Sequence, residues 1–237
     1  MPEVQNIFSE YGDVYENSHP MTIQQRKAFQ AIKQCRTSAL GGHVDECPDC
    51  GYQRPSYNSC RNRHCPKCQQ MLKERWIENQ SFDLLNIPYF HVVFTVPAEL
   101  NPIFLSNQEK LYRLLFSCAA ETLTQLAWNK KYLGAQIGCI EVLHTWGQNL
   151  HFHPHIHCIV PGGGLNKIGQ WIPSRKKFFI PVKVLSRLFR GKFLAALKNM
   201  DLDFCGSAKQ YEDPLDFRTV FWKMEHSKII LSESHFP

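Results

Sequence analysis

Long apolar runs are missing from this sequence of 237 residues. No uninterrupted apolar stretch approaches the roughly 18 residues that a membrane-spanning helix needs, so we expect no membrane partner. The opening segment, MPEVQNIFSEYGD, has neither the basic stretch nor the apolar stretch of a secretory signal. These two absences predict a cytoplasmic protein, whose ten cysteines stay reduced and serve as metal ligands or free thiols.

Acidic side chains are absent from residues 165–200, which nevertheless carry nine basic ones. These are Lys167, Arg175, Lys176, Lys177, Lys183, Arg187, Arg190, Lys192 and Lys198. Aromatic residues lie between them, and one sign of charge with interleaved aromatics suits contact with a nucleic acid. A second basic group lies among the cysteines, at Arg61, Arg63 and Lys67. A solvated surface would give the same patterns, so both interpretations stay open.

Hydrophobic periodicity predicts an α+β fold. With 43% hydrophobic and 20% charged residues, the composition is that of a folded chain rather than a disordered one. We expect helices over residues 22–35, 69–86, 106–128 and 181–200, and strands over 89–96, 136–144 and 152–160. Thr22 is expected to cap the first helix, and Ser106 with Glu109 to form a capping box at the third. A boundary near residue 86 would divide a helical, cysteine-rich domain (1–86) from a domain of strands and long helices (87–237).

Eight candidate metal ligands lie within residues 35–68, namely Cys35, His43, Cys47, Cys50, Cys60, His64, Cys65 and Cys68. Four of them form two pairs with Cys-x-x-Cys spacing, Cys47 with Cys50 and Cys65 with Cys68. Each such turn presents two thiolates to one tetrahedral ion, so these four predict a structural zinc site. The other four are candidates for a second zinc ion, because the segment has too few apolar residues to fold without help. Buried thiols and a surface histidine are the alternative, and spacing does not decide which ligands share an ion.

Four histidines of one parity lie in the segment HFHPHIHCIV, at residues 151, 153, 155 and 157. In a β-strand, residues of one parity share a face, so His155 and His157 would point the same way about 7 Å apart. That separation lets them share one divalent ion, while Ile156 would point into the core. Neutral imidazoles suit Mn²⁺ or Zn²⁺ better than Mg²⁺.

A third ligand is needed to complete such a site. Glu141 and His144 on the preceding strand, and His91 on the first strand, are the candidates, and none has support from spacing. His151 and His153 precede Pro154, which cannot donate to a strand ladder, and they stay unassigned. Four histidines on a solvent-facing strand are the alternative.

Several further motifs follow one another in a fixed order between about residues 25 and 200. They include Gly41-Gly42-His43, YNSCRNRHCPKC at 57–68, PYFHVVFT at 88–95, LHTWG at 143–147 and HPHIHC at 153–158, followed by three glycines. Together they resemble the rolling-circle insertion-sequence transposases of the HUH class, the paired-tyrosine family with an N-terminal zinc-binding domain. The order of the motifs carries this resemblance more than any single motif does.

The resemblance implies both a fold and an activity on DNA. The second domain would be of the HUH type, with an antiparallel sheet and packed helices, and the zinc module would help to recognise an element end. His155 and His157 would hold Mg²⁺ or Mn²⁺ against the scissile phosphate, and a tyrosine hydroxyl would attack to leave a 5′-phosphotyrosine link. The expected partner is DNA, in the form of single-stranded element ends.

The tyrosine-bearing helix of this family is the feature that the sequence lacks. Eight tyrosines are present, but only Tyr211 follows His157, and it lies three residues before Pro214 beside acidic residues. That is a poor setting for a nucleophile inside a helix. We therefore expect a transposase truncated at its C-terminus, with metal-binding and DNA-binding parts but impaired cleavage. A DNA-binding remnant that occupies element ends, and a metallohydrolase that activates water at the histidines, are the alternatives.

Overall fold

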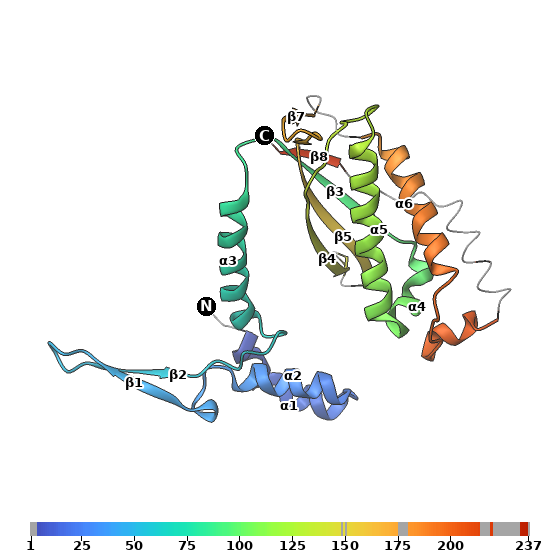
Figure 1. The fold of residues 1–237 in the computed structure, drawn as a ribbon. Helices are drawn as coiled ribbons and strands as arrows, with labels where there is room; N and C mark the ends of the chain where they lie inside the picture. Colours follow the sequence, from blue (N-terminus) through green and yellow to red (C-terminus); the bar gives the residue numbers. More distant parts are fainter. Residues whose placement is uncertain are drawn as a thin grey trace. The chain divides into compact units, whose positions relative to one another are not determined.

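Contacts between the elements divide the chain into two units, Met1–Leu84 and Leu85–Pro237. The structure, a computed structural model, describes residues 4–147, 149, 151–174, 180–213, 219 and 233–236. Figure 1 shows the helices and strands of each unit. The division falls after Leu84, whereas the boundary drawn from the sequence was residue 86.

Three α-helices belong to the N-terminal unit, α1 (Val4–Ser18), α2 (Ile23–Gln34) and α3 (Pro66–Asp83), with a short 3₁₀ helix at Ser38–Leu40. The start of α2 is set by the capping residue that the sequence predicts. The Thr22 hydroxyl accepts a hydrogen bond from the Gln25 amide at 3.2 Å, and the Gln25 side chain accepts one from the Thr22 amide at 2.9 Å. This reciprocal pair satisfies two amides that the helix itself leaves without a partner.

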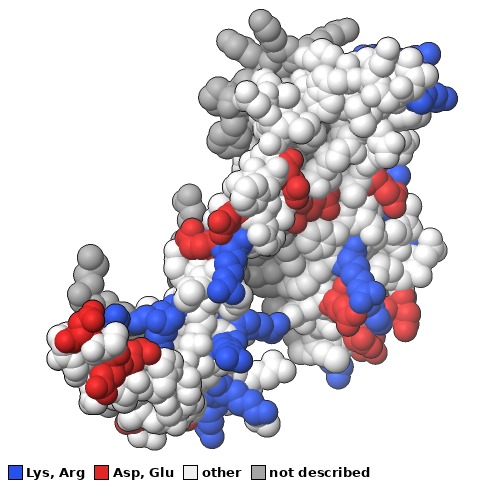
Figure 2. Space-filling view, turned by 60° about the vertical axis from the view of Figure 1, so that its left-hand side comes forward, with Lys and Arg blue, Asp and Glu red and all other residues white. Residues whose placement is uncertain are grey.

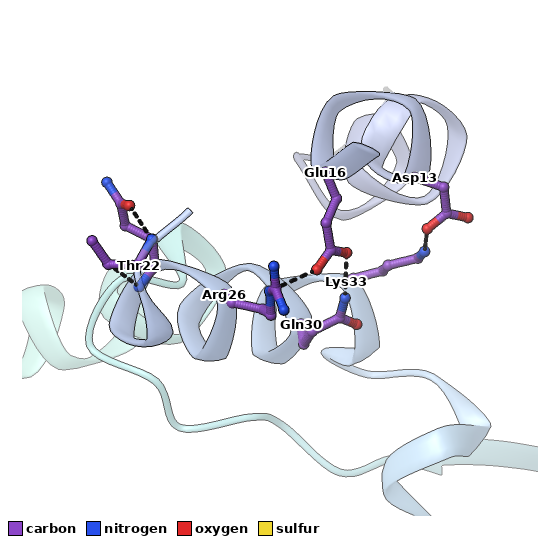
Figure 3. A network of polar contacts seen from close by, with 7 residues as sticks. Asp13, Glu16, Thr22, Arg26, Gln30 and Lys33 are labelled. Atoms are coloured by element: carbon purple, nitrogen blue, oxygen red, sulfur yellow. Dashed lines mark hydrogen bonds and ion pairs between the residues drawn. The ribbon is translucent and has the colours of Figure 1, made fainter. Parts of the chain in front are cut away.

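Polar contacts join α1 to α2 on their exposed side (Figure 3). Arg26 pairs with Glu16 at 3.1 Å, and Lys33 pairs with Asp13 at 2.5 Å. Exposed ion pairs of this kind contribute about 0–1 kcal/mol each, so they orient the two helices more than they stabilise them. The small apolar core of the unit gathers instead around Ile32 and three buried cysteines.

A two-stranded ribbon of β1 (Gly42–Glu46) and β2 (Gln53–Tyr57) completes the N-terminal unit. The strands are antiparallel, and Glu46 lies opposite Gln53 next to the turn. Every residue of the ribbon is exposed except Ser56, which is half-buried. Figure 1 shows the ribbon projecting away from α1 and α2, with its turn at the far end. An isolated two-stranded hairpin is at best marginally stable in water, so this ribbon needs support from elsewhere.

A four-stranded antiparallel sheet forms the centre of the C-terminal unit, in the order β4-β5-β3-β8. Its strands are β3 (Tyr89–Thr95), β4 (Ile140–Trp146), β5 (Phe152–Pro161) and β8 (Glu233–Phe236). The helices are α4 (Asn101–Ser106), α5 (Gln108–Trp128) and α6 (Val182–Leu197), with 3₁₀ helices at Ala98–Leu100 and Gly206–Tyr211. A small second ribbon pairs β6 (Gly163–Leu165) with β7 (Trp171–Pro173).

One face of this sheet is buried against α5 and α6, which Figure 1 shows on the same side. The even-numbered residues of β3 and β5 face this core, and Phe94 and Ile156 are both completely buried. Phe94 packs against Phe189 of α6 with a ring-centroid distance of 4.8 Å and an angle of 39° between the ring planes. Because strand residues alternate between faces, the odd-numbered histidines of β5 lie on the opposite face, which no described helix of the C-terminal unit covers (Figure 1).

The α+β fold class predicted from the sequence is confirmed, but α1, α4 and the β1–β2 ribbon were not predicted, and other elements differ at their ends. The predicted capping box of Ser106 with Glu109 is wrong. Ser106 is the last residue of α4, where its hydroxyl donates to the carbonyl of Cys205 at 3.1 Å, and Asn107 occupies the cap position of α5. Sequence spacing did not reveal α4, which makes Ser106 helical before α5 begins.

Among the helices that the structure describes, none is both long enough and apolar enough to cross a bilayer.

Candidate metal centres

Three histidines from two neighbouring strands converge on the uncovered face of the sheet. His155 and His157 lie on β5, and His144 on β4 is directly opposite His155 in the strand register. One ligand nitrogen from each of the three lies within 4.8 Å of the others. The rings of His144 and His157 meet edge to face with centroids 4.6 Å apart. We call this group the histidine centre.

On both β5 histidines, contacts to neighbouring groups occupy Nδ1 and leave Nε2 available as a metal ligand. The Nδ1 of His155 lies 2.7 Å from the backbone carbonyl of His153, so it carries the proton and donates. The Nδ1 of His157 lies 2.7 Å from the Nε2 of His91, and the two rings stack with an interplanar angle of 7°. His157 Nε2 is buried and, within the described residues, has no hydrogen-bond partner. A buried nitrogen lone pair without a partner is costly, and a bound metal ion would satisfy it.

Burial and mutual repulsion keep the rings of His157 and His144 neutral. Burial, followed by repulsion from His144, His155 and His91, lowers the pKa of His157 to about 4. Burial and the neighbouring His155 also lower the pKa of His144. Neutral imidazole is the form that coordinates metal, so His157 is ready to act as a ligand at neutral pH.

The structure separates the three candidates for the third ligand. His144 is part of the histidine centre. His91 is not, because its Nε2 contacts the Nδ1 of His157 and does not lie among the three ligand nitrogens. Glu141 has the opposite parity on β4, and its carboxylate lies 3.9 Å from the sulfur of Cys158 in the core. Burial accordingly raises the pKa of Glu141. Pairing of β4 with β5 as a hairpin could have identified His144, if the register had been known in advance.

The other two histidines of the segment lie at the margin of the centre or outside it. His153 shares the face, with its Nε2 3.0 Å from the Thr95 hydroxyl, and burial lowers its pKa. His151 is exposed, and its ring and amide contact the side chain of Asn149 in the turn. Pro154 lies where the register between β4 and β5 shifts, a position that tolerates a residue without an amide hydrogen.

Four cysteines of the N-terminal unit form a second cluster: Cys35, Cys60, Cys65 and Cys68. The sulfur of Cys68 lies 3.6 Å from that of Cys35 and 3.7 Å from that of Cys60. In a tetrahedron with Zn–S bonds of about 2.3 Å, neighbouring sulfurs lie about 3.8 Å apart. Four soft thiolates at this spacing fit a zinc ion, and we call them the cysteine cluster.

This grouping differs from the one expected from spacing. Cys65 and Cys68 share a site as predicted, but their partners are Cys35 at the end of α2 and Cys60 in the loop between β2 and α3. Cys47 and Cys50 lie instead in the turn of the β1–β2 ribbon. Of the two predicted histidine ligands, His43 is exposed on β1 with its ring 3.5 Å from Asp45, and His64 contacts Arg63 at 3.2 Å. Neither belongs to the cysteine cluster.

The four thiols of the cysteine cluster compete for ionisation. Burial raises the pKa of Cys60 to about 12 and also raises that of Cys35. Burial opposes ionisation of Cys68 too, but hydrogen bonds from the other three thiols outweigh it and hold its pKa at about 7. The cluster therefore favours a single thiolate without metal, and a dication is what allows all four to ionise.

The residues predicted to bind DNA fall into three groups. Arg61 and Arg63 are exposed beside the cysteine cluster, and Lys67 is half-buried in the first turn of α3. Figure 2 shows lysine and arginine side chains gathered over the N-terminal unit, in the lower left of the view, with acidic ones beside them. Arg175, Lys176 and Lys177 lie outside the described residues.

The third group, Arg187, Arg190 and Lys192, belongs to α6. This helix packs on the sheet face opposite the histidine centre, and Lys192 forms an ion pair with Glu121 of α5 at 2.8 Å. The structure therefore does not bring these residues to the histidine face.

Tyr211, the tyrosine that follows the histidines in the sequence, ends the 3₁₀ helix Gly206–Tyr211. Its side chain is partly buried and packs against the core on the helix-covered side of the sheet. Tyr89 has the parity of the histidine face on β3, and its hydroxyl accepts a hydrogen bond from the Leu85 amide at 2.7 Å. The expectation from the sequence concerned only tyrosines that follow His157, so it did not single out Tyr89.

Two protein families match the chain in the order of its units. A "Transposase zinc-binding domain" matches residues 7–96, and a family described as "Putative transposase" matches residues 138–231. The chain is 51% identical over 199 residues to "Putative transposase y4qJ" of Sinorhizobium fredii. The aligned region covers 83% of this chain and 50% of that protein. It is 37% identical over 139 residues to the "Transposase for insertion sequence element IS801" of Pseudomonas savastanoi pv. phaseolicola, covering 58% of this chain and 33% of that protein. The chain thus spans half or less of the length of these relatives.

Solved structures of the conjugative relaxase TrwC in complex with oriT DNA are similar at a lower level. One, described as metal-bound, has a TM-score of 0.40 and 9% identity, covering 92% of this chain and 80% of that chain. Another, described as copper-bound, has a TM-score of 0.36 and 13% identity, covering 59% of this chain and 64% of that chain.

Both matches are to transposase families, and the cysteine cluster lies within the residues that the zinc-binding domain matches. The chain belongs to a family of insertion-sequence transposases, as the order of its motifs predicted.

Proposed function

We propose that this chain binds single-stranded DNA ends of an insertion sequence and holds a divalent ion against a DNA phosphate at the histidine centre. The observation that carries the proposal is the buried Nε2 of His157, which faces two further imidazoles on a sheet face that no described helix of the same unit covers. A family of transposases supplies the substrate class.

The donor set decides which ion is preferred. His144, His155 and His157 supply three imidazole nitrogens and no carboxylate. Imidazole favours transition-metal ions, so we expect Mn²⁺ or Zn²⁺ to bind more tightly than Mg²⁺. When bound, the ion would withdraw electron density from a phosphate oxygen and offset the charge that grows there during strand cleavage.

The chain's own residues prepare the centre before any ion binds. The backbone carbonyl of His153 and the ring of His91 fix which nitrogen of His155 and His157 is available. The N-terminal unit would contact the DNA backbone through Arg61 and Arg63, which are exposed beside the cysteine cluster. We further propose that a polypeptide of these 237 residues binds DNA without forming a phosphotyrosine link, because Tyr211 packs on the opposite side of the sheet.

DNA binding is tested by titrating labelled single-stranded oligonucleotides from the flanks of the element at 50 to 200 mM salt. Affinity is expected to fall steeply with salt, because each phosphate contact releases counterions from the DNA. Replacing Arg61→Ala and Arg63→Ala together should reduce the log–log salt slope by about 1.4, at about 0.7 for each contact to a single strand. Arg113→Ala is the matched control, since Arg113 is exposed but already paired with Glu109.

The same samples, incubated with Mn²⁺ and run under denaturing conditions, report on cleavage. We expect no covalent protein–DNA band. A band that disappears in Tyr211→Phe or Tyr89→Phe would overturn the proposed loss of cleavage and identify the nucleophile. Affinity that is independent of salt, together with hydrolysis of a small phosphodiester, would instead favour the metallohydrolase.

His91 is expected to act as a positioning residue for the histidine centre. When His157 coordinates through Nε2, its Nδ1 carries the proton and donates to His91 Nε2, which lies 2.7 Å away. Loss of such an outer partner typically weakens metal binding about 10- to 100-fold, so His91→Ala should weaken Mn²⁺ binding in calorimetry by that factor. His91→Gln, which keeps an acceptor, should recover part of the loss, and His151→Ala should bind as the wild type does. Equal affinity in all variants would show that the contact is only packing.

A further inference from the structure

The Cys47–Cys50 turn takes no part in the cysteine cluster, although its spacing is that of a metal-binding turn. It closes the β1–β2 ribbon at the end that projects away from α1 and α2 (Figure 1). Cys50 is exposed and Cys47 is half-buried. Both thiols can therefore be reached by a partner from outside the N-terminal unit.

The backbone of the turn holds the two sulfurs as a pair. The backbone amides of Cys50 and Asp49, followed by the Cys50 thiol, lower the pKa of the Cys47 thiol. The Gly51 amide donates to the carbonyl of Cys47 at 2.9 Å, and Gly51 has a φ of +69°, which favours glycine. Amides directed at a sulfur stabilise the thiolate, the form in which cysteine binds zinc.

Two thiolates are only half of a structural zinc site, which takes four ligands. Within the described residues, no group of three or more potential ligands includes Cys47 or Cys50. His43, on the same ribbon, already lies 3.5 Å from Asp45. Among the described residues of the N-terminal unit, no third ligand reaches the turn, so the missing ligands must come from outside this unit.

We propose that the Cys47–Cys50 turn is half of a zinc site that a second copy of this chain completes with its own Cys47 and Cys50. Two identical turns related by a twofold axis supply four thiolates, which is the simplest way to fill a tetrahedral ion. The neighbouring side chains favour protein over DNA as the partner, because Glu46 and Asp49 are acidic and exposed and would repel phosphates.

The ribbon also carries surface that suits a second copy. Val44 and Tyr52 are 60% and 69% exposed, so the ribbon presents two large apolar side chains to solvent. An ion shared at the turn would support a hairpin that has no core of its own. It would also join two N-terminal units without using the cysteine cluster or the histidine centre.

The test compares the full chain with the double variant Cys47→Ser/Cys50→Ser, both purified with zinc and a phosphine reductant. Zinc content by elemental analysis should fall by half an ion per chain in the variant. Light scattering should show a dimer for the wild type and a monomer for the variant. Far-UV circular dichroism should be nearly unchanged, because the ribbon contributes nothing to the core. Cys205→Ser, which changes an exposed cysteine of the other unit, is the control.

Each alternative has its own outcome. A fall of one whole ion per chain with no change in mass would show that the site is completed within one chain, and would overturn the shared site. Unchanged zinc content would also overturn it. A dimer that survives in the variant would place the contact elsewhere and overturn the shared site, and a dimer that forms only when the reductant is left out would be a disulfide and would overturn it too. None of these results bears on DNA binding, so this proposal and the proposed function can fail separately.

Discussion

Replacing Cys68→Ser is expected to unfold the N-terminal unit while the C-terminal unit stays folded. Cys68 is buried, and its sulfur contacts two of the other three thiols of the cysteine cluster. The remaining core of the unit is small, since among the described residues its buried apolar side chains are Phe29, Ile32 and three cysteines. Structural zinc supplies about 10–16 kcal/mol in small zinc domains, more than such a core can replace.

The loss can be measured by limited proteolysis with mass spectrometry, which should show cleavage throughout residues 1–84 and protection of the core of residues 85–237. Cys50→Ser is the decisive control, because Cys50 belonged to the zinc site predicted from spacing but lies in the ribbon turn. It should leave the N-terminal unit protected. If Cys50→Ser exposes the unit as fully as Cys68→Ser does, the grouping of Cys35 and Cys60 with Cys65 and Cys68 is wrong.

The contrast between these two cysteines shows what spacing can and cannot predict. A Cys-x-x-Cys pair identifies two thiols that can share an ion, because the turn geometry is local. Such a pair does not indicate which residues elsewhere in the chain supply the other two ligands of the ion. Cys35 lies at the C-terminal cap of α2, and Cys60 lies before α3, where the next residue, Arg61, adopts a φ of +50°. Both depend on packing that no short motif encodes.

The histidine strand was more predictable for the same reason. Alternation along a strand is a local property, so the shared face of His155 and His157 followed from parity alone. The buried neighbours Ile156 and Cys158 confirm that alternation. The position of His144 required the register of β4 against β5, which shifts between His144 and Trp146. An irregularity of that kind is set by Pro154 and the turn together, and a sequence pattern does not locate it.

The basic stretch at 165–200 illustrates a different limit. Its charge pattern suited a nucleic acid and a solvated helix equally well. The structure places Leu185, Phe189 and Phe193 in the core, with α6 on the far side of the sheet from the histidines. The charges of α6 therefore follow from its amphipathic packing, and one of them, Lys192, is paired within the unit. For DNA contact the arginines beside the cysteine cluster are the better candidates.

Replacing His155→Ala and His157→Ala together is expected to abolish Mn²⁺ binding at the histidine centre, with more than about a 100-fold loss of affinity. That exceeds the loss expected from an outer partner such as His91, because two of the three coordinating nitrogens disappear. Calorimetry on the full chain measures the loss. Salt-sensitive DNA binding should persist, since it is assigned to the N-terminal unit, and the fold should survive because neither ring enters the core.

The pH dependence of stability offers an independent check on the same variant. The folded pKa of His157, about 4, lies below its ordinary value of 6.5, so the unfolded chain takes up a proton first as pH falls. The metal-free wild type should therefore lose stability between about pH 6.5 and pH 4, and the variant should lose less over that window. An identical slope in the two proteins would mean that His157 is not buried as the structure places it. Mn²⁺ binding that survives in the variant would move the divalent-ion site away from these strands.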